Sequence, residues 1–382
     1  MSALRNLVDK IKPTFTKGGK LGFLESTFDA FETFLFVPNT TTQKGAHIRD
    51  CNDMKRTMIM VVVALMPALL FGFYNTGYLH FLSQGVQPEF WASLWFGFLK
   101  VLPIIVVSYV VGLGIEFAFA QARGHEVNEG FLVTGLLIPM IMPVDIPLWM
   151  VALATAFSVI FGKEVFGGTG MNVFNPALLA RAFAFFASTP SMSGATVWIA
   201  GLSSGEGVVD GFSGATALEN LSTTGQMGYS AMDAFLGFIP GCIGETSTLA
   251  ILLGAAILLF TGVASWRTMV SVFVGGLAMG YFFQAIGVTT YPAWYHLIIG
   301  GFAFGAVFMA TDPVTSAQTN TGKYIVGLLT GALAVLIRVV NPAYPEGMML
   351  SILFMNALAP LVDYYVVEAN ISRRKKRVKL AK

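Results

Sequence analysis

The sequence predicts an all-α membrane protein that crosses the bilayer about ten times, in two five-helix repeats of opposite orientation. Of the 382 residues, 55% are hydrophobic and only 12% are charged. The mean hydropathy of +0.70 lies far outside the range of soluble globular domains. The 41 glycines are typical of helices that pack closely in lipid. Similar short motifs also recur about 170 residues apart, which indicates a duplicated unit.

Apolar runs define the expected spans, because a helix needs about 20 such residues to cross the hydrocarbon core. Runs that approach or exceed this length are 57–74, 95–118, 246–263, 268–286, 324–340 and 347–367. Shorter runs, interrupted or bounded by Pro and Gly, are 131–142, 147–161, 173–187 and 295–310.

The runs divide the chain into five parts. Residues 1–56 are polar and mixed in charge, so we expect no cleavable signal peptide there. A first membrane repeat (57–187), a loop (188–230) and a second membrane repeat (231–367) follow, and a basic tail (368–382) closes the chain.

The distribution of Lys and Arg predicts which side each loop faces, because basic residues are retained on the cytoplasmic side. HIRDCNDMKR precedes the first span and SRRKKRVKLAK ends the chain, so both ends are expected in the cytoplasm. Four loops expected on that side carry Arg123, Lys163, Arg267 and Lys323. Segments expected outside carry no basic residue: 75–94, 188–230 and 287–294. Arg338, near the outer end of the ninth span, is the exception.

Two pairs of motifs carry the repeat. MPVDIP and FNPAL occur in the first half, and TDPVTS and VNPAY follow in the same order in the second half. Inverted repeats with broken helices at matching places usually form a polar site near the membrane midplane. The alternative is that Asn-Pro-Ala, a common helix-start signal, recurs by coincidence. Asp145 and Asp312 occupy matching places, and we expect them to cap broken helices.

The stretch EVFGGTGMNVFNPALLARAF superficially resembles a nucleotide loop but lacks the Gly-Lys-Ser/Thr of a phosphate-binding loop. Three glycines permit left-handed or close-packed backbone: Gly167, Gly168 and Gly170. Asn172 and Asn175 can cap a helix or hydrogen-bond a planar polar ligand, and Pro176 suits a first helical turn. A re-entrant turn that holds a ligand and a purely structural helix start are both consistent with this stretch.

Two carboxylates, Glu116 and Asp363, lie inside apolar runs. A charge at the bilayer centre costs at least about 2.5–3.5 kcal/mol on insertion scales. Both residues are close to the expected cytoplasmic ends of their helices, so snorkelling to the interface is the favoured interpretation. The alternative is a sodium or proton station. Cys51 and Cys242 lack a CxxC or His neighbour and are expected to be ordinary thiols, with no metal site.

A Ser-Gly-Ala-Thr tetrad occurs twice, ending at Thr196 and at Thr216. A threonine hydroxyl is a poor nucleophile without an activating base, and neither copy has a His nearby. The remaining role is acceptor of a group that another enzyme transfers. Only the second copy follows an Asp-Gly pair, in DGFSGAT.

This heptad, which contains Asp210, Ser213, Gly214 and Thr216, resembles the sequence at which a flavin transferase joins FMN to a threonine through its phosphate. Further stretches make nearly the whole chain resemble the NqrB/RnfD family of membrane redox subunits: KGGK, HIRD, HEVNEG, KEVFGGTGMNVFNPAL, IPGCIGETSTLA, FMATDPV and IRVVNPAYPEGMML. The long N-terminal segment is more similar to the branch found in Na+-translocating NADH:quinone reductases than to the Rnf branch.

The resemblance implies a phosphoester-linked FMN on Thr216, no modification of Thr196, and a bound riboflavin. It also implies electron transfer to quinone within a Na+-pumping complex of a bacterial inner membrane. The implied partners are the A, C, D, E and F subunits of that complex, the flavin transferase and membrane lipid, and no nucleic acid.

The resemblance suggests further sites. The quinone region of the family has a Gly-Gly pair before the glutamate of helix two, and this chain has Gly112-Leu113-Gly114 instead, so one glycine is replaced. Glu116 and Asp363 are the candidates for the ion pathway. Riboflavin is assigned to the glycine-rich turn and its repeat mate: Gly168, Gly170, Asn172, Asn175 and Asn341.

Two other functions fit parts of the sequence. The Rnf branch would make the chain the RnfD component of a complex for ferredoxin-linked electron transfer. A flavin-free channel for a small solute would use the same inverted repeats, whose expected architecture is similar to that of urea transporters. The heptad around Thr216 favours the redox function, because a channel has no use for a flavin acceptor.

Overall fold

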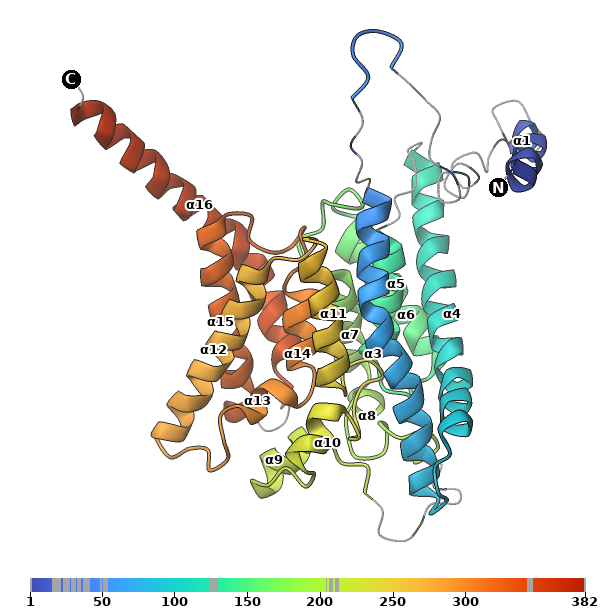
Figure 1. Ribbon diagram of the computed structural model, residues 1–382, viewed down its shortest axis with the longest axis vertical. Helices are drawn as coiled ribbons and strands as arrows, with labels where there is room; N and C mark the ends of the chain where they lie inside the picture. Colours follow the sequence, from blue (N-terminus) through green and yellow to red (C-terminus); the bar gives the residue numbers. More distant parts are fainter. Residues whose placement is uncertain are drawn as a thin grey trace.

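The computed structural model describes residues 2–15, 22, 28, 32, 36, 42–48, 50, 54–123, 130–203, 205, 209, 213–341 and 346–380, and every regular element within them is a helix (Figure 1). Five helices are long and apolar enough to cross a membrane: α3 (Met54–Ser83), α4 (Phe90–Arg123), α12 (Trp266–Ala285), α15 (Asn320–Val340) and α16 (Met348–Leu380). The chain is therefore a multi-pass membrane protein. A separate short helix, α1 (Ser2–Phe15), lies beside the upper end of the bundle in Figure 1.

Shorter apolar helices lie among the long ones. They are α5 (Phe131–Met140), α6 (Leu148–Val159) with its π-helical continuation η2 (Ile160–Glu164), α7 (Pro176–Ala187), α11 (Thr248–Phe260), and the broken series α13 (Tyr295–Ile298), α14 (Phe302–Phe304) and η3 (Gly305–Met309). Each apolar run of the sequence contains helix. The series α13 to η3 is broken at Gly300, whose φ of +62° is left-handed and which packs against Leu218.

The segment between α7 and α11 folds into small helices at the lower end of Figure 1: α8 (Thr189–Met192), α9 (Ala217–Thr224) and α10 (Ala231–Leu236). The start of α3 and the end of α16 lie at the opposite, upper end. A small apolar core of Leu218, Leu221, Ile239 and Ile299 attaches this segment to the bundle.

Long helices approach one another closely where glycines face a neighbour. A Cβ on Gly275 of α12 would lie only 2.8 Å from the carbonyl carbon of Leu328 on α15, and one on Gly331 would lie 2.9 Å from the carbonyl carbon of Val272. Small residues at such contacts let helix backbones meet, which is how membrane helices associate without a hydrophobic driving force. The α12–α15 pair thus depends on these glycines.

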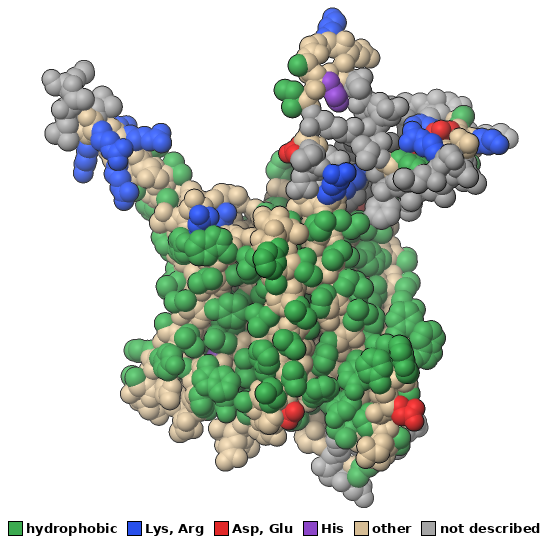
Figure 2. All heavy atoms as spheres, viewed as in Figure 1, with side chains coloured by type: hydrophobic (Ala, Val, Ile, Leu, Met, Phe, Trp, Pro, Cys, Tyr) green, Lys and Arg blue, Asp and Glu red, His purple; other side chains and the backbone are tan. Residues whose placement is uncertain are grey.

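Lys and Arg side chains gather at the upper end of the bundle, whereas the charged side chains visible at the lower end are acidic (Figure 2). Arg338, the exception in the sequence pattern, is only 4% exposed. Its guanidinium donates to the carbonyl oxygens of His296 (2.6 Å), Ile299 (3.1 Å) and Glu346 (2.9 Å). Arg338 is therefore a buried structural cation and not part of a loop.

Candidate functional site at Thr216

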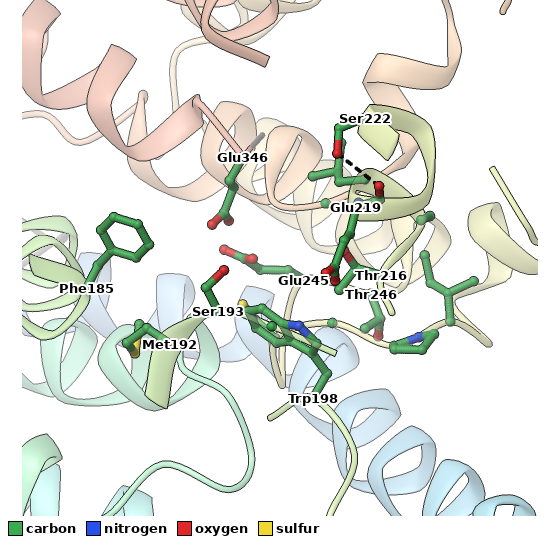
Figure 3. A pocket seen from close by; sticks show the side chains of 18 of the residues that line it. Phe185, Met192, Ser193, Trp198, Thr216, Glu219, Ser222, Glu245, Thr246 and Glu346 are labelled. Carbon is green, nitrogen blue, oxygen red and sulfur yellow. Dashed lines mark hydrogen bonds between the residues drawn. The ribbon is translucent and has the colours of Figure 1, made fainter. Parts of the chain in front are cut away.

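A cavity of about 220 Å³ opens among α7, the two tetrad segments, α9 and the chain before α11 (Figure 3). Its wall combines aromatic side chains with polar ones, among them Phe185, Ser193, Trp198, Thr216 and Thr246. Cavities with apolar walls and a few polar groups are typical of small-molecule and cofactor sites. The second tetrad threonine thus borders a space suited to a small molecule.

Thr216 is held in a defined position. It precedes α9 as the N-cap, and its Oγ1 accepts a hydrogen bond from the backbone N–H of Glu219 at 3.2 Å. The hydroxyl of Tyr229 donates to the carbonyl oxygen of Ala215 at 3.0 Å. Burial raises the pKa of the Tyr229 phenol, so it remains a hydrogen-bond donor at neutral and mildly alkaline pH.

The structure brings the two tetrads together. Ser193 of the first copy lines the cavity, and Gly214 of the second is buried against the carbonyl of Ala195. Thr196 is exposed and does not line the cavity, whereas Thr216 does. Of the other motif residues, Ser213 is exposed beside Gly214, and Asp210 lies outside the described residues.

A buried charge cluster forms part of the same cavity. Arg181 of α7 donates through Nη1 to Glu245 Oε1 at 3.1 Å and to the carbonyl oxygen of Ile141 at 2.6 Å, and its Nη2 pairs with Glu346. The side chains of Arg181, Glu245 and Glu346 are 4%, 7% and 16% exposed. Buried Cys242 lies beside them as a free thiol.

Sequence reasoning missed this cluster, although a signal for it existed. Arg181 lies inside the apolar run 173–187, and a charge in such a run is costly. The same signal identifies Glu116 and Asp363. The partners of Arg181 come from segments 64 and 165 residues away, so only the fold could identify them.

A second cavity of about 210 Å³ lies where α3 begins, beside the glycine-rich turn. Gly168 and Gly170 have φ values of +97° and +89°, which confirms the predicted left-handed backbone. Among the described residues, Asn172 and Asn175 line this cavity while the two glycines shape the turn beside it. Thr169, between the glycines, also lines it.

Asn175 performs the predicted capping role. Its Oδ1 accepts from the N–H groups of Ala177 (3.0 Å) and Leu178 (3.4 Å), and Pro176 is the first residue of α7. Its Nδ2 donates to Asp312 Oδ2 at 3.4 Å. The turn is thus a structural helix start that also borders a cavity.

Asn341 does not join this group. It follows α15 at the end of the bundle where Arg338 contacts α13, which is the lower end in Figure 1. Asn175 lies near the start of α3 at the upper end. The expectation that Asn341 shares a site with Asn175 is wrong, because the cavity that Asn175 lines does not include Asn341.

Glu116 is 4% exposed and pairs with Lys163 of η2, which is buried to the same extent. Snorkelling of Glu116 to the interface is therefore wrong, since its charge has a buried partner. Gly112 lies one helical turn earlier on the same buried face, against the ring of Phe131. Gly114 is exposed, and a Cβ added to it would have no neighbouring atom within 4 Å, so the two glycines do not form one surface.

The remaining carboxylates stabilise turns and helix ends. Asp363 is partly buried, and its oxygens accept from the N–H groups of Gln318 (2.6 Å) and Thr319 (3.1 Å) at the start of α15. Asp145 accepts from the N–H of Gly201 at 2.9 Å, and Asp312 closes its own turn. Asp363 thus holds the segment that leads into α15, whose N-cap is Thr319. The prediction that Asp145 and Asp312 cap helices is wrong, because their hydrogen bonds among the described residues go to turns and loops.

The family described as NQR2, RnfD, RnfE matches residues 41–372 of the chain. The chain is 47% identical to the B subunit of the Na(+)-translocating NADH-quinone reductase of Chromohalobacter salexigens, over 98% of this chain and 96% of the relative. It is also 47% identical to the protein of the same description from Stutzerimonas stutzeri, and 48% identical to that from Azotobacter vinelandii. Each of these two alignments covers 97% of this chain and 98% of the relative.

Proposed function

Because the chain belongs to the NQR2, RnfD, RnfE family, we propose that it is the flavin-carrying membrane subunit of a Na+-translocating NADH:quinone reductase. Its relatives are described as the B subunit of that complex. The observation that carries the proposal is the position of Thr216, half-buried at the rim of a cavity between α7 and α9. In this function the chain receives electrons and passes them toward quinone.

FMN, attached through its phosphate to Thr216, would supply one- and two-electron transfer at this cavity. The residues present suit such a group: Thr216 offers the attachment oxygen, while Phe185 and Trp198 offer aromatic surface for the ring system. Glu219 and Ser222 also line the cavity. Thr196 lacks the preceding Asp-Gly pair and does not line the cavity, so we expect it to remain unmodified.

Riboflavin is assigned to the second cavity, near the start of α3. Asn172 and Asn175 present amide groups that match the polar edge of a flavin ring, and Phe308 and Leu137 provide apolar wall. Gly168 and Gly170 set the backbone of the adjoining turn, and Asn341 is not part of this assignment.

We assign the quinone contact and the ion pathway to the membrane helices. We keep Gly112 as the candidate quinone contact, because it contacts Phe131 and lies one helical turn from Glu116. A Cβ on Gly114 would have no neighbouring atom within 4 Å, so Gly114 is not part of this assignment. Glu116 with Lys163, and Asp363 of α16 beside the start of α15, are the candidates for ion movement.

The topology proposed for this function is ten membrane segments in two inverted repeats, with an architecture similar to that of urea transporters. The first repeat comprises α3, α4, α5, α6 with η2, and α7. The second comprises α11, α12, the series α13 to η3, α15 and α16. Basic residues gather at the end where α3 starts and α16 finishes, which supports a cytoplasmic location of both termini in a bacterial inner membrane (Figure 2).

The partners of this function are the A, C, D, E and F subunits, the flavin transferase and the surrounding lipid. Ferredoxin-linked transfer in an Rnf complex is a second candidate, because the family includes RnfD. A flavin-free channel is disfavoured by the cavity at Thr216 and by the relatives described above.

Flavin attachment tests the proposal directly. The full chain is coexpressed with a flavin transferase as wild type, Thr216→Ala and Thr196→Ala, and flavin fluorescence is read on the denatured band. We expect fluorescence in wild type and Thr196→Ala, and none in Thr216→Ala. Fluorescence that persists in Thr216→Ala, or a dark wild-type band beside a labelled control protein, would refute the assignment.

The riboflavin assignment has a separate test. Non-covalent flavin is extracted from purified Asn172→Ala and Asn341→Ala and quantified against wild type. We expect a loss of at least half in Asn172→Ala only, because Asn172 lines the cavity and Asn341 is at the other end of the bundle. Equal retention in both variants contradicts the assignment.

A further inference from the structure

The cluster of Arg181, Glu245 and Glu346 is unbalanced in charge. One guanidinium contacts two carboxylates, so the ionised cluster carries one net negative charge. All three side chains are at least 84% removed from solvent, since the most exposed of them is 16% exposed. Charges in such surroundings are poorly screened and act strongly on neighbouring groups.

The cluster faces the cavity that Thr216 borders. Figure 3 shows the carboxylates of Glu245 and Glu346 pointing into the same space as the side chain of Ser193. Arg181, Glu245, Glu346 and Thr216 all line that cavity. A ring system attached to Thr216 and occupying this space would have the cluster as part of its surroundings.

Arg181 is rigidly placed. Its Nη1 is shared between Glu245 and the backbone carbonyl of Ile141, and its Nη2 is held by Glu346. A planar guanidinium whose two terminal nitrogens are both hydrogen-bonded loses little further conformational freedom when a ligand enters. Such a fixed charge contributes to the energy of a redox group without reorganising.

We propose that Arg181 is a positioning residue for the flavin on Thr216, and that the cluster of Arg181, Glu245 and Glu346 sets the midpoint potential of that flavin. This inference rests on the proposed function. Reduction brings an electron, delivered by the donor that the complex supplies, next to a cluster that carries one net negative charge when ionised. Each carboxylate therefore opposes reduction, and Arg181 favours it. The cluster transfers no proton or electron itself.

The test is a potentiometric titration of the covalent flavin in full-length protein, followed by absorbance, with the Thr216→Ala titration subtracted. Glu245→Gln removes one negative charge, and Arg181→Gln/Glu245→Gln removes the opposing positive charge as well. This double variant avoids leaving both carboxylates without a cation. Asp233→Asn of α10 is the matched control, because Asp233 is absent from the residues that line this cavity.

We expect Glu245→Gln to raise the midpoint potential of the flavin. The ratio of reduced to oxidised flavin at a given potential should increase roughly tenfold, equal to about 59 mV for a one-electron step. The double variant should have a midpoint potential lower than that of Glu245→Gln by a similar amount, and therefore close to that of wild type. Asp233→Asn should leave the midpoint potential unchanged. If the cluster had only a structural role, the midpoint potential would shift in the same direction in both cluster variants.

An unchanged potential in Glu245→Gln, or equal shifts of the same sign in both cluster variants, overturns the inference. If the double variant does not incorporate flavin, the single variant decides. Failure of the proposed function gives a different result, namely a wild-type band without flavin fluorescence beside an active transferase.

Discussion

The buried pair of Lys163 and Glu116 gives the sharpest stability prediction. Both side chains are 4% exposed, so replacing Lys163 by Met leaves a carboxylate buried without its cation. Removing one partner of such a pair costs about 3–5 kcal/mol, because the desolvated charge is no longer compensated. We expect Lys163→Met to lower the free energy of unfolding by that amount.

The double variant Lys163→Met/Glu116→Gln should recover most of the loss, since no charge then remains buried. Lys100→Met is the matched control: Lys100 is 46% exposed and lies 3.9 Å from Asp145, so its removal should cost at most about 1 kcal/mol. Unfolding by SDS in mixed micelles, followed by circular dichroism, measures all three. A cost for Lys163→Met no larger than that for Lys100→Met would show that this reasoning is wrong.

Two further perturbations separate residues that look alike in sequence. Gly112→Ala places a methyl group on the ring of Phe131 and should impair both stability and quinone reduction, whereas Gly114→Ala meets open space and should leave both unchanged. Melting temperature and quinone reductase rate of the assembled complex test this, and equal effects of the two variants would contradict it. Asp363→Asn keeps the size of a carboxylate that accepts from Thr319 N–H but removes its charge, and should cost about 1 kcal/mol of unfolding free energy. If this variant unfolds at the same temperature as wild type, the carboxylate does not stabilise the segment before α15.

Much of the fold could be predicted because the bilayer restricts the possibilities. Runs such as 95–118 and 324–340 are apolar for most of their length, and their helices α4 and α15 contain these runs. The helix start at Asn175-Pro176 was also predictable, since an Asn cap followed by proline is a local signal. The small helices α8, α9 and α10 were not predicted, because they lack an apolar run of membrane length.

The site was predictable only where the residues that define it are contiguous in the sequence. Thr216 ends a heptad that can be read directly, whereas the grouping of Arg181 with Glu245 and Glu346 depends on the packing of three distant segments. The interpretation of Glu116 as a snorkelling carboxylate failed because its partner, Lys163, is 47 residues away. Long-range pairing of charges is decided by tertiary packing, which residue spacing does not contain.

The N-cap position of Thr216 has a consequence for the maturation of the protein. The first turn of α9 presents backbone N–H groups that have no partner within the helix, and the helix dipole gives that end a partial positive charge. A phosphodiester formed on Thr216 would add an anion at this point, where it can accept hydrogen bonds that the hydroxyl alone cannot satisfy. Covalent modification would thus strengthen the local fold, so that the mature loop resists thermal fraying and proteolysis better than its unmodified precursor.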